Sequence, residues 1–202
     1  MFVGRHFVGN ILLRSAMLFG LLLASPAMAT ENEPKVGDDG MYTQDWFKHT
    51  SFLDLADDLQ EAGDQSRHLA ILFEQKGCPY CREMHRVNFA DADIRNYIKK
   101  NFDVVQLNLW GDREVTDFDG EQLSEKKLGR KYRVMFTPTI LFIDEKGEEV
   151  VRMPGYFKPF HFKQLFVYAA EKGYVEQPNF QRWLSARADE MRAEGKEVKL
   201  WD

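Results

Sequence analysis

The stretch "FEQKGCPYCREMHR", residues 73–86, contains both cysteines of this 202-residue chain, Cys78 and Cys81. A disulfide that closes so short a loop stabilises a fold by only about 2 kcal/mol, against about 3 kcal/mol for a 15-residue loop. A chain of this length buries roughly 70 % of its unfolded surface and needs no such link to fold. Redox chemistry or metal binding therefore explains the pair better than stability does.

The residues around the two cysteines favour a redox centre. The apolar run "HLAILFE" (68–74) predicts a buried strand, and Pro79 fits the first turn of a helix, where no backbone N–H is needed. Cys78 would then lie at the helix N-terminus, where free N–H groups and the helix dipole favour a thiolate. A thiolate is the nucleophilic form of cysteine. Cys81, one turn further on, is placed to resolve a mixed disulfide.

A metal site is the alternative interpretation of the same residues. Cys78, Cys81 and His85 fall at i, i+3 and i+7 on one helix face and could supply three soft ligands. A structural zinc site takes four ligands, however, and the remaining histidines are scattered along the chain. Arg82 stands where covalent haem attachment requires histidine. We therefore expect no metal and no cofactor beyond the Cys78–Cys81 disulfide, and we expect His85 to pack or to tune the thiols by charge.

Residues 1–29 have the order of a secretory signal peptide. Arg5 and Arg14 precede the apolar run "AMLFGLLLAS", and the small residues Ala27 and Ala29 follow. The run falls short of the roughly 20 residues that span a membrane, so a retained anchor is the less favoured alternative. We expect cleavage after Ala29 and export to the periplasm, an oxidising compartment where a thiol pair can cycle.

The chain that remains after cleavage is modestly acidic. It keeps 25 of the 27 basic residues and all 32 acidic ones, which gives a net charge of −7. Without a basic patch, nucleic acid is not an expected partner. This length suits one domain. The segment 30–41 is short and polar, so we expect it to be a flexible lead-in that does not suggest a separate dimerisation domain. We therefore expect a monomer.

The order of the remaining elements indicates an α/β fold. A helix is predicted from Ser51, strands at 68–74 and 102–109, a hairpin around Lys146 and Gly147, and a helix over 160–170. Such an order predicts a central mixed β-sheet flanked by helices over residues 42–175. The polar residues 110–130 form an insertion. For residues 176–202 we predict an amphipathic helical extension whose helix begins at Pro178.

A second motif lies sixty residues after the cysteines, in "VMFTPTILFID" (134–144). Pro138 stands between two threonines immediately before a strand. A cis peptide bond between Thr137 and Pro138 would present a backbone edge to a docked substrate. A trans proline at the first position of the strand is the alternative.

Together these motifs resemble the thioredoxin fold. The matching segments are "GCPYC" (77–81), "TPT" (137–139) and the hairpin "EKGEEVVRMPGY" (145–156), in that order. More narrowly, "DWFKHTSFLDLADDL" (45–59), "VTDFDG" (115–120) and "MPGYFKPFHF" (153–162) are similar to the SoxW-type exported thioredoxin-like proteins associated with sulfur oxidation. The resemblance implies a periplasmic thiol–disulfide oxidoreductase that keeps exported client proteins reduced and receives electrons from a membrane thiol donor.

The sequence also departs from this family. Thioredoxins carry a buried aspartate where this chain has Leu72, and the Cys-Pro-Tyr-Cys motif is the one familiar from glutaredoxins, which leaves glutathione use open. Glu74 lies two residues further along the strand and therefore on the same face as Leu72. We expect Glu74 to accept the proton of Cys81, the alternative being a solvated charge at the strand end.

The resemblance also implies a docking surface. We expect Thr137, Pro138, Tyr80 and Pro79 to line it. For Tyr80 the alternative is an exposed aromatic side chain that binds no partner. Reduction of clients is favoured by resemblance alone. A disulfide oxidase or isomerase, and a Cys/His metal-binding carrier, stay open as alternatives, because no reading of two intervening residues fixes a redox potential.

Overall fold

The computed structural model describes residues 1, 4, 33–49 and 51–200. The predicted signal peptide therefore lies almost entirely outside the described residues. Within the described part, no helix combines the length and the apolar character that crossing a membrane requires.

The centre of the fold is a four-stranded mixed sheet. Its strands are β1 (His68–Glu74), β2 (Phe102–Asn108), β5 (Thr139–Ile143) and β6 (Glu149–Pro154), in the order β2-β1-β5-β6. β1 runs parallel to β2 and antiparallel to β5, and β5 pairs antiparallel with β6. The parallel pair needs a crossover, which the helices between β1 and β2 provide, whereas a tight turn suffices for the β5–β6 hairpin. This architecture confirms the predicted fold class.

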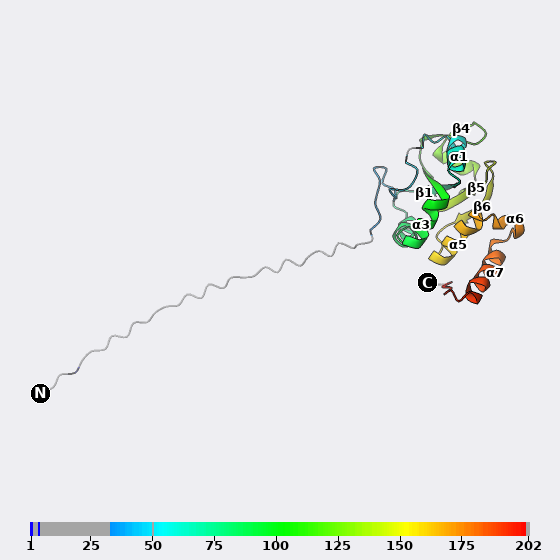
Figure 1. Cartoon of the computed structure of the whole chain (residues 1–202). Coiled ribbons are helices and arrows are strands. Elements are labelled where there is room, and N and C mark those ends of the chain that lie inside the picture. Colours follow the sequence, from blue (N-terminus) through cyan, green and yellow to red (C-terminus); the bar gives the residue numbers. More distant parts are fainter. Residues whose placement is uncertain (2–3, 5–32, 50, 201–202) are drawn as a thin grey trace. The chain divides into compact units, whose positions relative to one another are not determined.

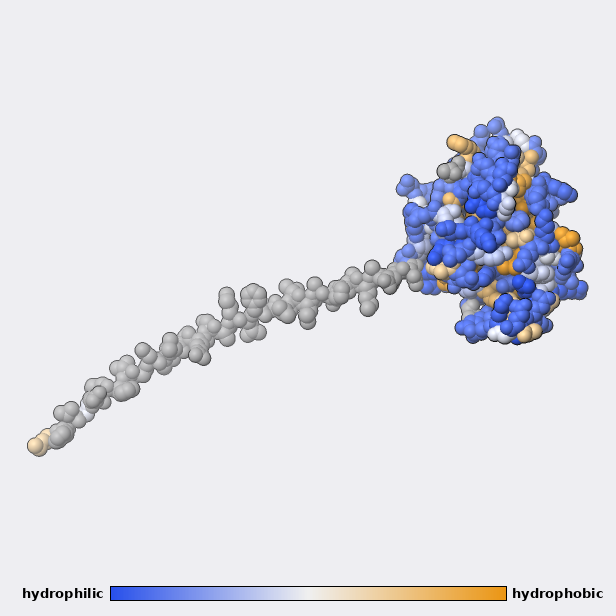
Figure 2. Space-filling model, in the orientation of Figure 1, coloured by the Kyte–Doolittle hydropathy of each residue, from blue (hydrophilic) through white to orange (hydrophobic). Residues whose placement is uncertain are grey.

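Alternating apolar side chains bury both faces of the sheet. In β1, Ala70 and Leu72 belong to one core cluster, whereas Leu69, Ile71 and Phe73 belong to the other. A strand that is buried on both sides reads as a continuous apolar run, which is why "HLAILFE" shows no alternation of polarity. The face of the domain seen in Figure 2 is accordingly mainly hydrophilic.

Helices cover each face of the sheet (Figure 1). One face packs against the π-helix η1 (Met84–Asn88), which continues α2 (Pro79–Glu83), and against α3 (Ala92–Asn101) and α5 (Pro159–Ala170). The other face packs against α1 (Leu55–Asp64), α4 (Glu125–Lys131) and the small hairpin of β3 (Glu114–Thr116) and β4 (Gln122–Ser124). The chain ends with α6 (Gly173–Glu176) and α7 (Phe180–Ala193), which extend the layer of α5.

The first helix begins later than predicted. Asp54 caps α1, because its carboxylate accepts hydrogen bonds from the backbone N–H groups of Ala56 and Asp57, both at 3.1 Å. Ser51, the predicted start, instead donates to Asp58 at 2.5 Å. The short apolar periodicity could not distinguish the two starts, because Ser and Asp are both good caps.

Two other helices also differ from the prediction. The last helix starts at Phe180 with Asn179 as its cap, so Pro178 lies outside it. The helix that follows the cysteines is not a continuous α-helix, because residues Met84–Asn88 form a π turn in which the N–H of Phe89 donates to the carbonyl of Met84 at 3.0 Å. Such turns are frequent at functional sites.

The predicted lead-in and insertion both contain hydrogen-bonded structure. In the lead-in, Val36 bridges to Tyr42, and Met41 is buried. In residues 110–130, β3 and β4 form a hairpin, and the buried carboxylate of Asp117 pairs with the ammonium group of Lys131 at 2.6 Å. Residues 33–41 of the lead-in and the insertion therefore both pack onto the domain.

Candidate active site around the Cys78–Cys81 disulfide

The two cysteines are joined in a disulfide at the start of α2. Cys78 is the N-cap residue, its sulfur accepts the backbone N–H of Cys81 at 3.0 Å, and Pro79 occupies the first helical turn. Gly77, with φ of +71°, turns the chain from β1 into the helix in a conformation that other residues adopt only with strain. The predicted strand and helix start are therefore both present.

The Thr137–Pro138 loop lies directly against the disulfide. Its peptide bond is cis. The hydroxyl of Thr137 donates to the sulfur of Cys78 at 3.4 Å, and the carbonyl oxygen of Thr137 lies 3.6 Å from the same sulfur. In this disulfide form Cys78 is only 3 % exposed, and the side chain of Thr137 contacts its sulfur.

The sheet topology explains why these loops meet. The same end of the sheet holds the C-terminal ends of β1 and β2 and the N-terminal end of β5, because β1 is parallel to β2 and antiparallel to β5. Exposed aromatic side chains surround this end: Tyr80 is 63 % exposed, Trp110 61 % and Phe136 59 %. The indole Nε1 of Trp110 donates to the side chain of Gln75 at 2.8 Å. Trp110 is thereby held beside the turn that carries the cysteines.

Glu74 is fully buried, which excludes the solvated strand-end charge. Both of its carboxylate oxygens lie 3.1 Å from Nε2 of His85, and the side-chain nitrogen of Gln106 also donates to it. On the other side of the ring, Nδ1 of His85 lies 3.1 Å from Nε2 of Gln44. The side chains of Glu74 and His85 are both 0 % exposed. The polar side chains thus satisfy one another beneath the active-site helix.

The two cations near the cysteines are largely engaged by the lead-in segment. Arg82 forms an ion pair with Glu33, which raises the pKa of the guanidinium. The alkyl chain of Lys76 lies against Gly40, where an added Cβ would meet it at 3.0 Å. For Arg82, the carboxylate of Glu33 therefore offsets part of the positive potential at Cys78.

The predicted metal alternative does not match the arrangement of these side chains. Cys78 and Cys81 are bonded to each other, and both ring nitrogens of His85 contact polar side chains. Within the described residues, no three His, Cys, Asp or Glu side chains gather as a metal-binding group.

Sequence reasoning missed two residues and one contact of this site. Gln44 and Gln106 could not be found, because their contacts with His85 and Glu74 join segments far apart in the sequence. The contact of His85 with Glu74 was missed as well, although its signal was present: His85 follows Cys81 by four residues on the face that meets the strand.

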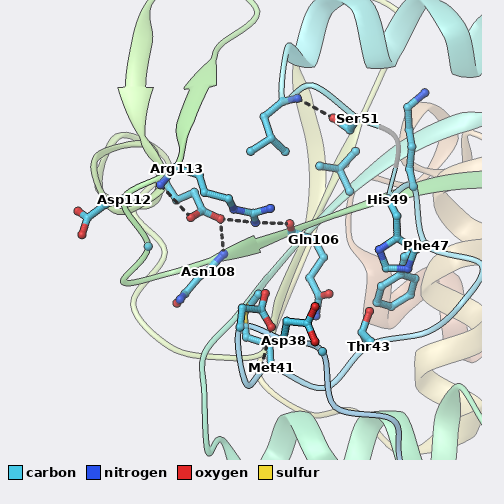
Figure 3. A pocket seen from close by; sticks show the side chains of 17 residues that line it. Asp38, Met41, Thr43, Phe47, His49, Ser51, Gln106, Asn108, Asp112 and Arg113 are labelled. Carbon is cyan, nitrogen blue, oxygen red and sulfur yellow. Dashed lines mark hydrogen bonds and ion pairs between the residues drawn. The ribbon is translucent and has the colours of Figure 1, made fainter.

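A cavity of about 490 Å³ lies beside β2 (Figure 3), and neither cysteine is among the residues that line it. Gln106, Thr43 and Phe47 are among its lining residues. Within it, Glu125 accepts the backbone N–H of Asn108 at 2.8 Å and the guanidinium of Arg113 at 2.6 Å. Gln106 thus both lines this cavity and donates to the carboxylate of Glu74.

Comparison with known proteins agrees with the fold. The model of the family described as "Thioredoxin-like domain" matches residues 55–170. This chain belongs to the thioredoxin-like family. The match includes the cysteines, the Thr137–Pro138 loop and all four strands of the central sheet.

One curated relative is the thiol:disulfide interchange protein DsbD of Colwellia psychrerythraea, which is 27 % identical over 115 residues. The match covers 56 % of this chain and 17 % of that longer protein. Among solved structures, a thioredoxin-fold protein from Helicobacter pylori superposes with a TM-score of 0.51 at 23 % identity, over 60 % of this chain and 81 % of that one. A thioredoxin from Thermus thermophilus gives a TM-score of 0.46 at 23 % identity, over 62 % and 94 %.

Proposed function

We propose that this chain is an exported thiol–disulfide oxidoreductase that reduces disulfides of client proteins in the periplasm. The observation that carries the proposal is the Cys78–Cys81 disulfide at the N-terminus of α2, with Thr137 in contact with the Cys78 sulfur. The family and the DsbD relative support the same chemistry. The narrower SoxW-type assignment, with its link to sulfur oxidation, rests on the sequence resemblance described above.

In the reductive direction, the Cys78 thiolate attacks one sulfur of a client disulfide and displaces the other as a thiolate. Cys81 then loses its proton to Glu74 and attacks the Cys78 sulfur. The intermolecular disulfide breaks, and the client leaves with both of its sulfurs reduced. Its two electrons come from the Cys78 and Cys81 thiols, which are oxidised to the Cys78–Cys81 disulfide. A membrane thiol donor restores the dithiol. The two sulfurs carry the electrons, so the proposal needs no nucleotide, metal or other cofactor.

The docking surface comprises Thr137, Pro138, Pro79 and the exposed ring of Tyr80. Pro79 and Tyr80 follow Cys78 directly in α2, and Thr137 and Pro138 form the cis peptide loop whose threonine hydroxyl contacts the Cys78 sulfur, which supports this assignment. The client is a disulfide-bearing exported protein, and the chain acts as a monomer without nucleic acid.

Two variants test the reaction. The Cys78→Ser variant should abolish reduction of insulin disulfides by the chain beginning at Thr30. The Cys81→Ser variant should accumulate a mixed disulfide through Cys78, detectable by mass spectrometry as a reductant-sensitive adduct. Unchanged insulin reduction by C78S would disprove the function.

The equilibrium redox potential tests the direction. A potential near −270 mV, measured against a glutathione or dithiothreitol series, agrees with a reductase. A potential near −120 mV would instead assign the chain as a disulfide oxidase.

A further inference from the structure

We propose that His85 is a positioning residue for Glu74: its Nε2–H holds Glu74 as an ionised, aligned carboxylate that accepts the proton of Cys81. The inference rests on the proposed function and adds to it a residue that neither the motif nor the family match singles out. Four side chains carry it: Glu74 from β1, His85 from η1, Gln106 from β2 and Gln44 from the segment before α1.

The contacts of His85 fix which ring nitrogen carries the proton. The side-chain nitrogen of Gln44 faces Nδ1 at 3.1 Å, and an amide nitrogen can only donate. Nδ1 is therefore the acceptor, and the proton of the neutral ring lies on Nε2. Both oxygens of Glu74 lie 3.1 Å from that nitrogen, so the imidazole donates to the carboxylate.

Burial makes this donation necessary. An ionised carboxylate without partners is costly in a protein interior, and it would take up a proton instead. Glu74 is 0 % exposed, and hydrogen bonds from His85 and Gln106 stabilise its charged form. A carboxylate kept ionised in this way can accept a proton, whereas a carboxylic acid cannot.

His85 and Cys81 share the buried face of the active-site helix. They are four residues apart, which is about one turn, and they are 1 % and 0 % exposed. Met84, between them, packs in the same cluster as Leu72, the residue of β1 that shares a face with Glu74. The geometry therefore brings the Cys81 thiol and the Glu74 carboxylate to the same side of the sheet.

The remaining neighbours of His85 are mainly aromatic. The ring centroids of Phe89, Phe47 and Tyr42 lie 5.1, 5.7 and 6.1 Å from that of the imidazole. Among the described groups that contact the ring, the titratable ones are Glu74 and Tyr42, and the uncharged polar ones are the two glutamine amides. No cation among these contacts competes with His85 for the carboxylate.

The proton transfer balances within the proposed reaction. The S–H bond of Cys81 breaks, and its proton forms an O–H bond on Glu74 while Nε2–H of His85 stays in place. The Cys81 sulfur then attacks Cys78, the client thiolate leaves, and no further oxidant or reductant takes part. When a membrane thiol reduces the disulfide again, the proton returns from Glu74 to Cys81.

The test compares two amides at position 85. Glutamine places its terminal nitrogen near the position of Nε2, whereas asparagine reaches only as far as Nδ1. Reduced wild type, His85→Gln, His85→Asn and Glu74→Gln are mixed with insulin, quenched with acid, and separated by mass into free, mixed-disulfide and oxidised protein at pH 6 to 9. His68→Gln serves as the matched control, because His68 lies at the opposite end of β1.

We expect H85N and E74Q to prolong the lifetime of the mixed disulfide at pH 7 on the order of 100-fold. Their rates should recover as the pH rises past about 8.5, the ordinary pKa of a cysteine thiol, because the thiol then ionises without the help of Glu74. H85Q should stay within a few-fold of wild type, and H68Q should equal it. An H85N profile that matches wild type, or an H85Q variant as slow as H85N, overturns the proposal.

A spectroscopic measurement keeps the proposal testable should a variant fail to fold. Imidazole nitrogen NMR of the oxidised wild-type protein should show His85 with a proton on Nε2 and none on Nδ1. A proton on Nδ1 with Nε2 bare overturns the proposal. Failure of the proposed function is distinguishable, because wild-type protein would then leave insulin oxidised at every pH whatever the tautomer of His85.

Discussion

The carbonyl oxygen of Thr137 lies 3.6 Å from the sulfur of Cys78, although 59 residues separate the two in the sequence. The Thr137 hydroxyl approaches the same sulfur at 3.4 Å. One residue therefore both covers the sulfur and offers it a hydrogen-bond donor. When the disulfide is reduced, that donor faces the position of the thiolate.

We expect Thr137→Val to slow the reaction of Cys78. Valine keeps the shape of threonine but loses the hydroxyl that stabilises a negatively charged sulfur, so the rate of iodoacetamide alkylation at pH 7 should fall about 3- to 30-fold, corresponding to 0.7–2 kcal/mol. Thr139→Val, which removes a hydroxyl that bonds to the carbonyl of Phe136 instead, is the matched control. Equal alkylation rates for T137V and wild type would contradict the assignment.

Trp110→Ala should weaken the reaction with protein clients alone. The indole is 61 % exposed and is fixed by Gln75, and exposed aromatic side chains held in one orientation commonly dominate binding energies. We expect kcat/KM for insulin to fall about tenfold, or about 1.4 kcal/mol. The rate with oxidised glutathione should change little, because so small a disulfide does not reach the ring.

The matched control for Trp110 is Val175→Ala. Val175 is an exposed apolar residue on α6, with 70 % of its surface accessible. It lies near the end of β1 opposite to the cysteines, because α6 closely follows Ala170, whose backbone bonds to His68 at that end. A loss for V175A as large as that for W110A would mean that general surface apolarity, and not the position of Trp110, determines the rate.

Gly111→Ala should destabilise the fold. A Cβ at this position would overlap the Glu125 carboxylate and lie 2.9 Å from Cβ of Asn108. Glu125 is 1 % exposed and bonds to Asn108 and Arg113, so it has little room to move. We expect the free energy of unfolding in urea to fall by about 1–3 kcal/mol.

Gly63→Ala provides the opposite case for comparison. This glycine lies near the end of α1, and a Cβ there would meet nothing within 4 Å. Replacing a helical glycine by alanine should raise the free energy of unfolding by up to about 1 kcal/mol. If G111A proves as stable as G63A, the inference that Glu125 leaves no room for a Cβ at position 111 is wrong.

His68→Gln should reduce the acid sensitivity of the fold. Burial lowers the pKa of His68 below its ordinary value of 6.5. As the pH falls through 6.5, the unfolded chain binds a proton that the folded chain takes up only at lower pH, so wild type loses stability in that window. Urea midpoints at pH 7.0 and 5.5 should therefore differ less for H68Q. An identical decline in both proteins would refute this role for His68.

Local sequence patterns determined much of this protein. The apolar run at 68–74 and the proline at position 79 predicted a buried strand and a helix with Cys78 at its N-terminus, and the structure contains both. Each of these features depends on backbone conformation and hydrogen bonding within a few residues. The mixed sheet followed because the order of such elements restricts the topologies that can bury their apolar faces.

Helix boundaries were less well predicted, because several capping residues stand close together. Ser51 and Asp54 are both suitable caps, and the choice depended on Ser51 bonding to Asp58. The π turn at Met84–Asn88 likewise could not be predicted from the local sequence, because its residues make tertiary contacts. One of these is the hydrogen bond that the Asn88 side chain donates to the carbonyl oxygen of Phe157 at 2.9 Å.

Only the tertiary structure decided which groups meet at the active site. Glu74 contacts His85 and Gln106, which are 11 and 32 residues away, and Cys78 contacts Thr137, which is 59 residues away. Strand alternation specified the face on which Glu74 lies but not the helix that covers that face. Such contacts depend on how the helices cross the sheet, and that geometry is set by the packing of the whole core.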